Sequence, residues 1–381
     1  MTIKSTPTTA NAMRPDMPFI VTVSKCIELC HNLVSFTCTA PALLPFVMTK
    51  FVDSKNHKPR LSEVKLEAMT LNLAEATQLA KLQGLRHLTL EAPSRGMLDQ
   101  LSKWVRNNKE QLTSLSISNS IDLTSELLGY SLAHVSNLKS LSINNCLSIT
   151  HRDLLRLLNR YPQHALESLA LTIYTSTLQA DALWPELVSL KNLTIYVRQC
   201  GKQDLNPTVI SVLGCVSNAA LESLTLRNID RVDTDKSVLD KAIKDHKMTL
   251  RKFNLISFML TADQVKTVCM ELKELRQFAV YITMHPEALA TALSKAKKLA
   301  TLIDTQSATG HASRDPNLDS WSVRKLFQKC VGLKTVKITG RTYTAEWLEK
   351  SGSKKELKIT LQRLRQPFVI LSEGSNGKWE L

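Results

Sequence analysis

A short hydrophobic pattern recurs along the chain and constrains its fold more than any other feature. An apolar residue is followed by two other residues, a second apolar residue, one other residue and a third apolar residue, as in Leu112, Leu115 and Ile117. Alternation of this kind is typical of a β-strand with one buried face. A single such strand cannot bury its apolar face alone, so we expect successive copies to stack around one continuous core.

The copies are evenly spaced along the sequence. Their first apolar residues are Leu33, Leu61, Leu85, Leu112, Leu138, Leu166, Leu190, Leu221, Leu250, Leu275, Leu299 and Leu333, and a divergent thirteenth copy begins at Leu357. The 324 residues from Leu33 to Leu357 make twelve steps of 27 residues on average. A leucine-rich repeat has about 20–29 residues. The spacing therefore predicts a leucine-rich-repeat solenoid of about twelve repeats.

Between the strands, the apolar residues follow the period of an α-helix. They fit one helix face in three places: Leu154, Leu157, Leu158 and Tyr161; Val265, Val268, Cys269 and Leu272; and Val323, Leu326, Phe327 and Cys330. Helix-start patterns precede two of them, at Thr150 and Thr261, each with an acidic or amide residue three positions later. Each repeat is therefore predicted to be strand, loop, helix and loop. The predicted fold class is α/β, with the shape of a curved horseshoe. Parallel strands line its concave face and helices cover its convex face.

The unbroken repeat predicts a single elongated domain rather than the two or three that length alone suggests. Residues 1–17 are polar and are expected to be a disordered N-terminal tail, followed by the solenoid over 18–345. Residues 346–371 are expected to form a C-terminal cap that shields the last repeat, because apolar residues alternate at Leu357, Ile359 and Leu361. Residues 372–381 are expected to be a polar tail.

Composition and motifs argue against several classes of protein. No window approaches the roughly 18 apolar residues of a membrane-spanning helix, and the N-terminus shows no secretory signal pattern. Most of the cysteines lie on helix core faces or at strand ends, and buried, reduced thiols of a cytoplasmic or nuclear protein are predicted. Cys26, Cys30 and His31 do not have zinc-knuckle spacing. The sequence contains no Gly-rich phosphate loop and no recognised catalytic motif, so no metal, no cofactor and no enzymatic activity are predicted.

Binding is the expected use of a curved repeat array. In each copy the leucines face the core, so the third, fifth and seventh positions face the concave side. The seventh positions of repeats seven to ten, Tyr196, Arg227, Ile256 and Tyr281, are expected to form one lateral row. With Lys252, these residues are predicted to bind a protein partner, since Tyr and Arg often anchor protein interfaces. The alternative is that Tyr and Ile are present as good strand formers and that Arg is solvated beside them.

Positive charge is concentrated towards the C-terminus. The formal net charge is +15; residues 241–381 contain 25 Lys and Arg against 13 Asp and Glu, and residues 1–240 contain the remaining 24 and 21. A basic patch is predicted at Lys295, Lys297, Lys298, Arg324, Lys325, Lys354 and Lys355. Such a patch attracts acidic protein, nucleic acid or an anionic membrane. The alternative is a set of solvated helix surfaces, and few aromatic residues accompany the charges, which disfavours base stacking.

Parts of the sequence resemble fungal leucine-rich-repeat proteins of the F-box type. The resemblance is carried by residues 31–41, 85–90 and 138–146, and Cys146 at the ninth repeat position matches the cysteine-containing repeat subclass. It covers about residues 18–345. The resemblance implies an F-box that docks on the adaptor of a cullin–RING ubiquitin ligase and repeats that hold the protein to be ubiquitinated. However, no F-box pattern precedes Leu33, so an adaptor is expected as a partner only if an F-box is supplied elsewhere.

The leading hypothesis from the sequence is thus a non-catalytic scaffold that recognises a protein on its concave face, as the substrate-recognition part of a ubiquitin ligase. The alternative hypothesis is binding of nucleic acid or an anionic surface through the basic C-terminal third. A third hypothesis, an enzyme or enzyme activator, depends only on an exposed loop arginine such as Arg314.

Overall fold

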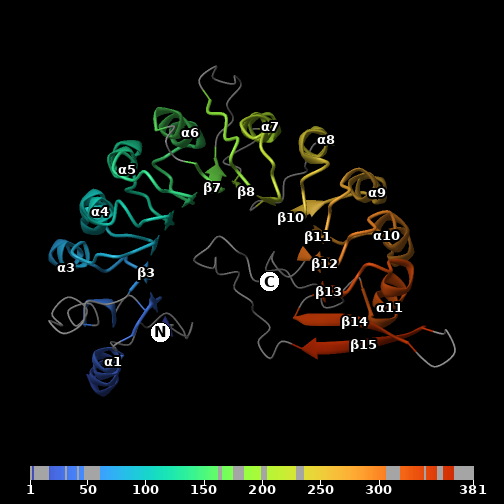
Figure 1. Ribbon diagram of the computed structural model, residues 1–381, viewed down its shortest axis with the longest axis horizontal. Helices are drawn as coiled ribbons and strands as arrows, with labels where there is room; N and C mark the ends of the chain where they lie inside the picture. The colour runs from blue at the N-terminus through green and yellow to red at the C-terminus, as the bar shows by residue number, and fades with distance from the viewer. Residues whose placement is uncertain are drawn as a thin grey trace. The chain divides into compact units, whose positions relative to one another are not determined.

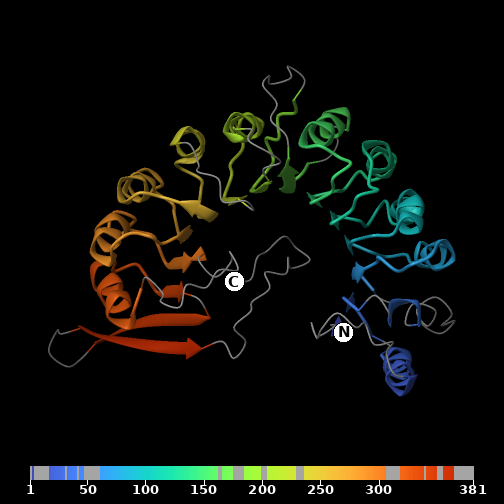
Figure 2. The same cartoon turned by 180° about the vertical axis from the view of Figure 1, so that it is seen from behind.

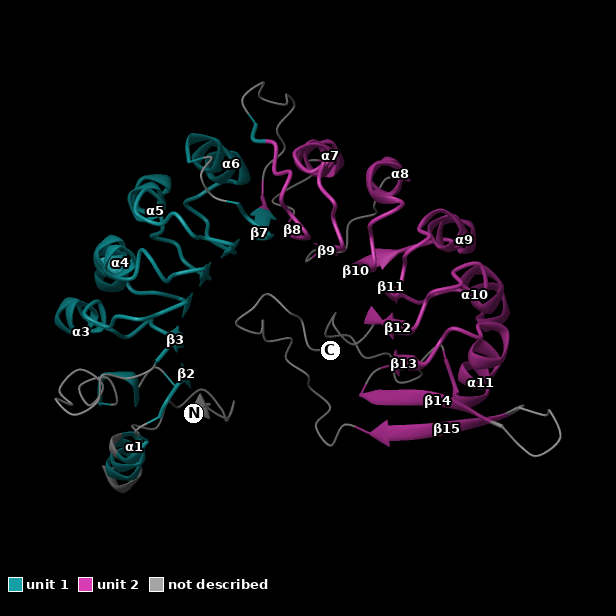
Figure 3. Cartoon of the chain, viewed as in Figure 1, with its two compact units in different colours: residues 1–172, 183–185, 373–378 teal, residues 173–182, 186–372, 379–381 magenta. Residues whose placement is uncertain are grey.

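The structure is a computed structural model (Figure 1). It describes residues 2–3, 17–30, 32–40, 43–46, 61–161, 165–174, 184–198, 204–228, 236–305, 318–338, 340–349 and 355–363. The described residues form two compact units (Figure 3). Unit 1 contains the described residues up to 172 and residues 184–185, and unit 2 contains residues 173–174 and those from 186 onwards. Each unit contains several of the repeats, and their organisation as one domain stays a prediction.

Unit 1 is built from strands that follow one another in parallel, with helices between most of them. Its elements are β1 (Thr2–Ile3), α1 (Met17–Leu29), β2 (Ser35–Cys38), β3 (Glu63–Glu67), α3 (Leu73–Leu79), β4 (His87–Glu91), α4 (Arg95–Asn107), β5 (Ser114–Ser118), α5 (Ser125–Leu132), β6 (Ser140–Asn144), α6 (His151–Arg160) and β7 (Ser168–Ile173). Each strand pairs with the next one in the chain. The helices lie on the outer side of the strands, as seen from both directions (Figures 1 and 2).

Unit 2 continues the same pattern and ends in an antiparallel hairpin. Its elements are β8 (Asn192–Val197), α7 (Asn206–Gly214), β9 (Ser223–Asn228), α8 (Lys236–His246), β10 (Lys252–Met259), α9 (Ala262–Glu271), β11 (Gln277–Tyr281), α10 (Pro286–Leu293), β12 (Thr301–Asp304), α11 (Ser320–Lys329), β13 (Thr335–Ile338), β14 (Arg341–Glu349) and β15 (Lys355–Arg363). Strands β8 to β13 pair in parallel, whereas β13, β14 and β15 pair antiparallel.

The repeated leucines form the core of both units. The first apolar residue of every copy from Leu61 to Leu333 is at most 2% exposed. Equivalent residues of neighbouring repeats lie in register, as Leu115 does with Leu141. Phe253 and Phe278 stack with their ring centroids 6.2 Å apart. Because every strand repeats the same apolar positions, the buried side chains of one repeat pack directly on those of the next.

Side-chain caps begin several helices where the sequence predicted them. The hydroxyl of Thr261 accepts a hydrogen bond from the backbone N–H of Gln264, whose side chain accepts one from the backbone of Thr261. Thr150 and Asp153 form the same reciprocal cap at the start of α6. Both predicted capping boxes are therefore confirmed.

The buried faces of two of the three predicted helices are confirmed, and that of α6 is corrected. Val265, Val268 and Cys269 are buried in α9, and Val323, Leu326 and Phe327 are buried in α11. In α6, however, Leu155 is buried together with Leu154 and Leu158, whereas Leu157 and Tyr161 are half-buried. The buried face of α6 is therefore centred on Leu154, Leu155 and Leu158, and Leu157 lies towards α5, where a methyl group added at Gly129 would approach its side chain to 3.1 Å.

The final hairpin places the alternating residues of the C-terminal region on one side of the sheet. Leu357, Ile359 and Leu361 lie on β15 opposite Trp347, Ala345 and Tyr343 of β14. Since β14 begins at Arg341, the predicted boundary between solenoid and cap at residue 346 falls inside this strand. Residues 364–371 of the predicted cap, the predicted polar tail 372–381 and the loop arginine Arg314 lie outside the described residues.

At the N-terminus, Thr2–Ile3 pair with β2, and residues 4–16 of the predicted tail lie outside the described residues. Among the helices of the described residues, none has both the length and the apolar character needed to cross a membrane.

Candidate functional site

The candidate site lies on the strand face of unit 2, across β8 to β11. Tyr196 of β8 is in register with Arg227 of β9, and Arg227 is in register with Ile256 of β10. These three residues form the lateral row that was expected. Lys252 lies at the start of β10, in register with Ser223 and Gln277.

A β-bulge moves Tyr281 out of that row. Ser257 has a positive φ of 65°, and the pairing of β10 with β11 shifts between Asn254 and Met259. Met259 rather than Ile256 is therefore the residue opposite Tyr281. The expectation of one row of four residues is wrong in this detail, because a bulge inserts extra residues into one strand only.

The residues of the predicted patch differ in how much of each side chain solvent can reach. Tyr196 is 7% exposed and Ile256 is 3% exposed, so both are buried in this structure. Arg227 and Tyr281 are half-buried, and Lys252 is exposed. Met259, which is not one of the predicted binding residues, is 60% exposed beside Tyr281. Its only signal in the sequence was the long apolar stretch of β10, which cannot reveal the bulge.

A short chain of hydrogen bonds holds the centre of this face. The side-chain amide of Asn254 donates to the Thr225 hydroxyl at 3.0 Å, and the side-chain amide of Gln277 donates to Oδ1 of Asn254 at 3.1 Å. These two hydrogen bonds link β9, β10 and β11. Because Asn254 is only 8% exposed, its bonds fix the strands in one position more firmly than solvent-exposed bonds would. We define the concave patch as Arg227, Lys252, Met259 and Tyr281, the accessible residues around this network.

The strand face of unit 1 is different in chemistry. It carries rows of hydroxyl side chains, among them Ser116 and Ser142, which lie in register on β5 and β6. Two carboxylates lie side by side further along, because Glu67 of β3 is in register with Glu91 of β4. Partial burial, and then the charge of Glu91, raise the pKa of Glu67 above its ordinary value. A positively charged or hydrogen-bond-donating group is therefore favoured there.

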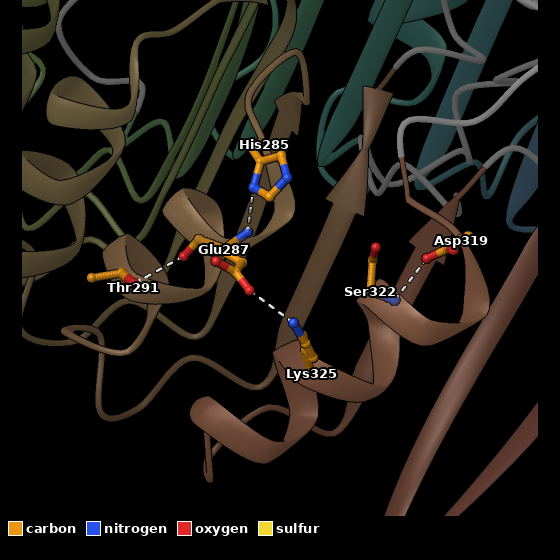
Figure 4. A network of polar contacts seen from close by, with 6 residues as sticks. All are labelled: His285, Glu287, Thr291, Asp319, Ser322 and Lys325. Atoms are coloured by element: carbon orange, nitrogen blue, oxygen red, sulfur yellow. Dashed lines mark hydrogen bonds and ion pairs between the residues drawn. The ribbon is translucent and has the colours of Figure 1, made fainter.

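The predicted basic patch is dispersed, and part of its charge is already neutralised. Lys298 forms an ion pair with Glu274, and Lys325 forms one with Glu287 at 2.8 Å (Figure 4). The ammonium of Lys325 also lies 3.6 Å from the ring centroid of Trp321. These cations are less available to a partner than the sequence suggested.

The remaining members of the predicted patch are spread over several elements. Lys295 and Lys297 are exposed in the loop after α10, and Arg324 is exposed on α11. Lys355 begins β15, and Lys354 lies outside the described residues. The basic patch is therefore not a single surface on the described part of the chain.

The part of the chain that the structure describes holds no group of three or more His, Cys, Asp or Glu side chains suited to a metal ion. Cys26 and Cys30 are free and exposed on and just after α1, and His31 lies outside the described residues.

Comparison with protein-family models and with curated proteins gave no match. Solved structures do match. A chain of the yeast Rad7–Elc1 complex is 15% identical in sequence, with a TM-score of 0.52 over 85% of this chain and 82% of that chain. The leucine-rich-repeat-containing protein LegL7 from Legionella pneumophila is also 15% identical, with a TM-score of 0.47 over 87% of this chain and 98% of that one. The fold is an α/β leucine-rich-repeat solenoid. The prediction of this fold class is confirmed, and the exact number of repeats stays a prediction.

Proposed function

We propose that this chain is a recognition scaffold that binds a protein partner through the concave patch of unit 2. The observation that carries the proposal is the grouping of Arg227, Lys252, Met259 and Tyr281 around the ordered Thr225–Asn254–Gln277 network. Arg and Tyr are enriched among the residues that dominate binding energy at interfaces. Met adapts its shape to varied apolar surfaces. A rigid base below accessible anchor residues lowers the entropic cost of association.

We further propose that the partner is a protein to be ubiquitinated. It rests on the resemblance of the repeats to fungal proteins of the F-box type. It also draws on the Rad7–Elc1 complex, in which a chain of similar fold is part of a two-protein assembly. On this proposal the solenoid supplies the substrate-binding surface and acts without catalysis of its own, and a ligase adaptor is a partner only if an F-box is supplied elsewhere.

The test is capture of partners from a fungal lysate by the full chain and by a variant with Arg227→Ala, Lys252→Ala and Tyr281→Ala. We expect one dominant protein to be retained by the wild type and lost from the variant, because accessible anchors contribute most of the binding energy. Recovery of a ubiquitin-ligase component with the wild type would support the proposal that the partner is a protein to be ubiquitinated.

A matched control carries three substitutions of exposed residues on the helices of unit 2: Lys266→Ala, Arg324→Ala and Gln328→Ala. Both variants should show the circular dichroism of the wild type, and the control should retain the partner. Equal capture by the wild type and the concave variant would rule out the concave patch.

A further inference from the structure

A second surface of unit 2 lies where its helices end and its next strands begin. We define the basic edge by exposed cations of the last helical turns and of the loops that follow them, between α8 and β13: Lys244, Lys247, Arg276, Lys295, Lys297, Lys329 and Lys334. These loops touch one another. The backbone N–H of Lys273 donates to the carbonyl oxygen of Lys247 at 3.3 Å, and that of Ala300 donates to the carbonyl oxygen of Arg276 at 2.8 Å.

The contact continues to the last loop of the series. The backbone N–H of Lys334 donates to the carbonyl oxygen of Ala300 at 2.8 Å. A methyl group added at Gly332 would approach the carbonyl oxygen of Lys297 to 2.8 Å, so the loops after α10 and α11 are in close contact. The cations of the basic edge therefore belong to one continuous surface.

The positive charge on this edge exceeds the local negative charge. Three acidic groups nearby are already paired, Glu274 with Lys298, Glu222 with Arg251 and Asp245 with Lys241, whereas Glu271 is exposed at the end of α9. Within the described part of the chain, the cations that define the basic edge form no ion pair. The partial negative charge at helix C-termini favours cations in the last turn. It does not account for Arg276, Lys297 and Lys334, which lie beyond the last turn of their helices.

Exposed apolar side chains lie among these cations. Met248 is 63% exposed, Val331 is 74% exposed and Met270 is 37% exposed. The ammonium of Lys273 donates a hydrogen bond to the backbone carbonyl oxygen of Met270, so the charge of Lys273 lies close to Met270. Phosphates of a nucleic acid make no favourable contact with such apolar side chains. Trp321 could stack with a base, but it lies in the first turn of α11, at the opposite end of the helix from Lys329.

We infer that the basic edge binds an acidic protein segment in which Asp or Glu residues alternate with apolar residues. The carboxylates would pair with the exposed cations, and the apolar side chains would cover Met248, Met270 and Val331. This inference concerns a different surface from the concave patch, so it does not depend on the proposed function.

The test measures binding of a fluorescent peptide of alternating Glu and Leu by anisotropy. The edge variant carries Lys247→Glu, Lys297→Glu and Lys334→Glu, and the control carries Lys236→Glu, Lys266→Glu and Arg324→Glu. Both variants change the net charge of the chain equally, at exposed positions of unit 2. We expect the Kd of the edge variant to rise by about tenfold or more and that of the control by less than about threefold, because close charge pairs act locally.

Further probes decide the chemistry of the ligand and the place where it binds. Met248→Ser with Val331→Ser should weaken binding of the Glu–Leu peptide and leave binding of a Glu–Ser peptide unchanged. The concave variant of the preceding section should bind the peptide like the wild type. An equal loss of affinity for the peptide in the edge and control variants would overturn the inference. Tighter binding of single-stranded RNA or of phosphatidylserine vesicles than of the peptide would overturn it too.

Discussion

At the scale of single residues, burial decides the chemistry of the polar groups. His151 begins α6 and is only 1% exposed, with its ring 6.4 Å from that of Trp184 in an edge-on arrangement. Burial lowers the pKa of His151 from 6.5 to about 4. His246, at the end of α8, is also 1% exposed, and burial lowers its pKa too. Both imidazoles are therefore neutral in the folded protein at neutral pH, and neither has the exposure that a surface pH sensor requires.

His151 should make the folded state sensitive to acid. The unfolded chain takes up a proton on this residue near pH 6.5, whereas the folded chain does so only near pH 4. Stability is therefore full above pH 6.5 and falls as the pH decreases towards 4, by about 2 kcal/mol between pH 8 and pH 5 for this group alone. In His151→Gln, urea unfolding should show a correspondingly smaller loss over this range. An identical pH dependence in the two proteins would show that His151 is not buried as a neutral group.

At the scale of the element, β10 departs from the other strands and shapes the concave patch. It has 8 residues, compared with 6 in β9 and 5 in β11. Its backbone turns into the left-handed region at Ser257, and this bulge aligns Met259 with Tyr281. Ser is tolerated at a positive φ, whereas a β-branched side chain is strongly disfavoured there. The apolar end of the patch thus depends on the backbone conformation of one residue.

Replacement of Ser257 tests the bulge directly. Ser257→Val should lower the free energy of unfolding by about 1–2 kcal/mol, because a left-handed conformation is costly for a branched residue. Ser257→Gly should be neutral or slightly stabilising, since glycine adopts a positive φ without steric cost. The measurement is the urea midpoint of each variant. Thr194→Val on β8 is the matched control, and it should change stability little, because Val is favoured in an extended strand. A tolerated Val at 257 would contradict the bulge.

At the scale of the whole molecule, the repeated core protects side chains in repeats throughout the described part of the chain. Cys38, Cys146, Cys215, Cys269 and Cys330 are buried free thiols, although they come from repeats far apart in the sequence. Burial raises the pKa of Cys146 and Cys330 to about 11, and that of Cys215 and Cys269 to about 12. The thiolate is the reactive form of cysteine, so these groups are doubly protected, by lack of access and by lack of charge.

Alkylation should report on this protection throughout the fold. In the native protein at neutral pH, iodoacetamide should modify Cys26 and Cys30, which are exposed, and leave the five buried thiols unmodified. In denaturant all of them should react. Peptide mass spectrometry gives the modified fraction at each position. Rapid native modification of Cys146 or Cys269 would show that the corresponding repeat is not packed as described.

The sequence by itself determined the fold class, the positions of the core leucines and the capped helix starts at Thr150 and Thr261. These features depend on local spacing, and in a solenoid each repeat packs only on its neighbours, so a repeated local pattern is enough to specify the core. The sequence also marked Arg227, Lys252 and Tyr281 as residues of one face, because strand alternation fixes the direction of each side chain.

The tertiary structure alone decided which of those side chains solvent can reach and which charges are free. The burial of Tyr196 and Ile256 depends on contacts that strand alternation does not describe. The bulge at Ser257 changes the register by a backbone rotation that no local pattern predicted. Lys325 is paired with Glu287, 38 positions away, only because α10 and α11 lie side by side. The basic edge likewise appears only when loops from successive repeats are brought into contact, since its cations are scattered in the sequence and their charges add only in space.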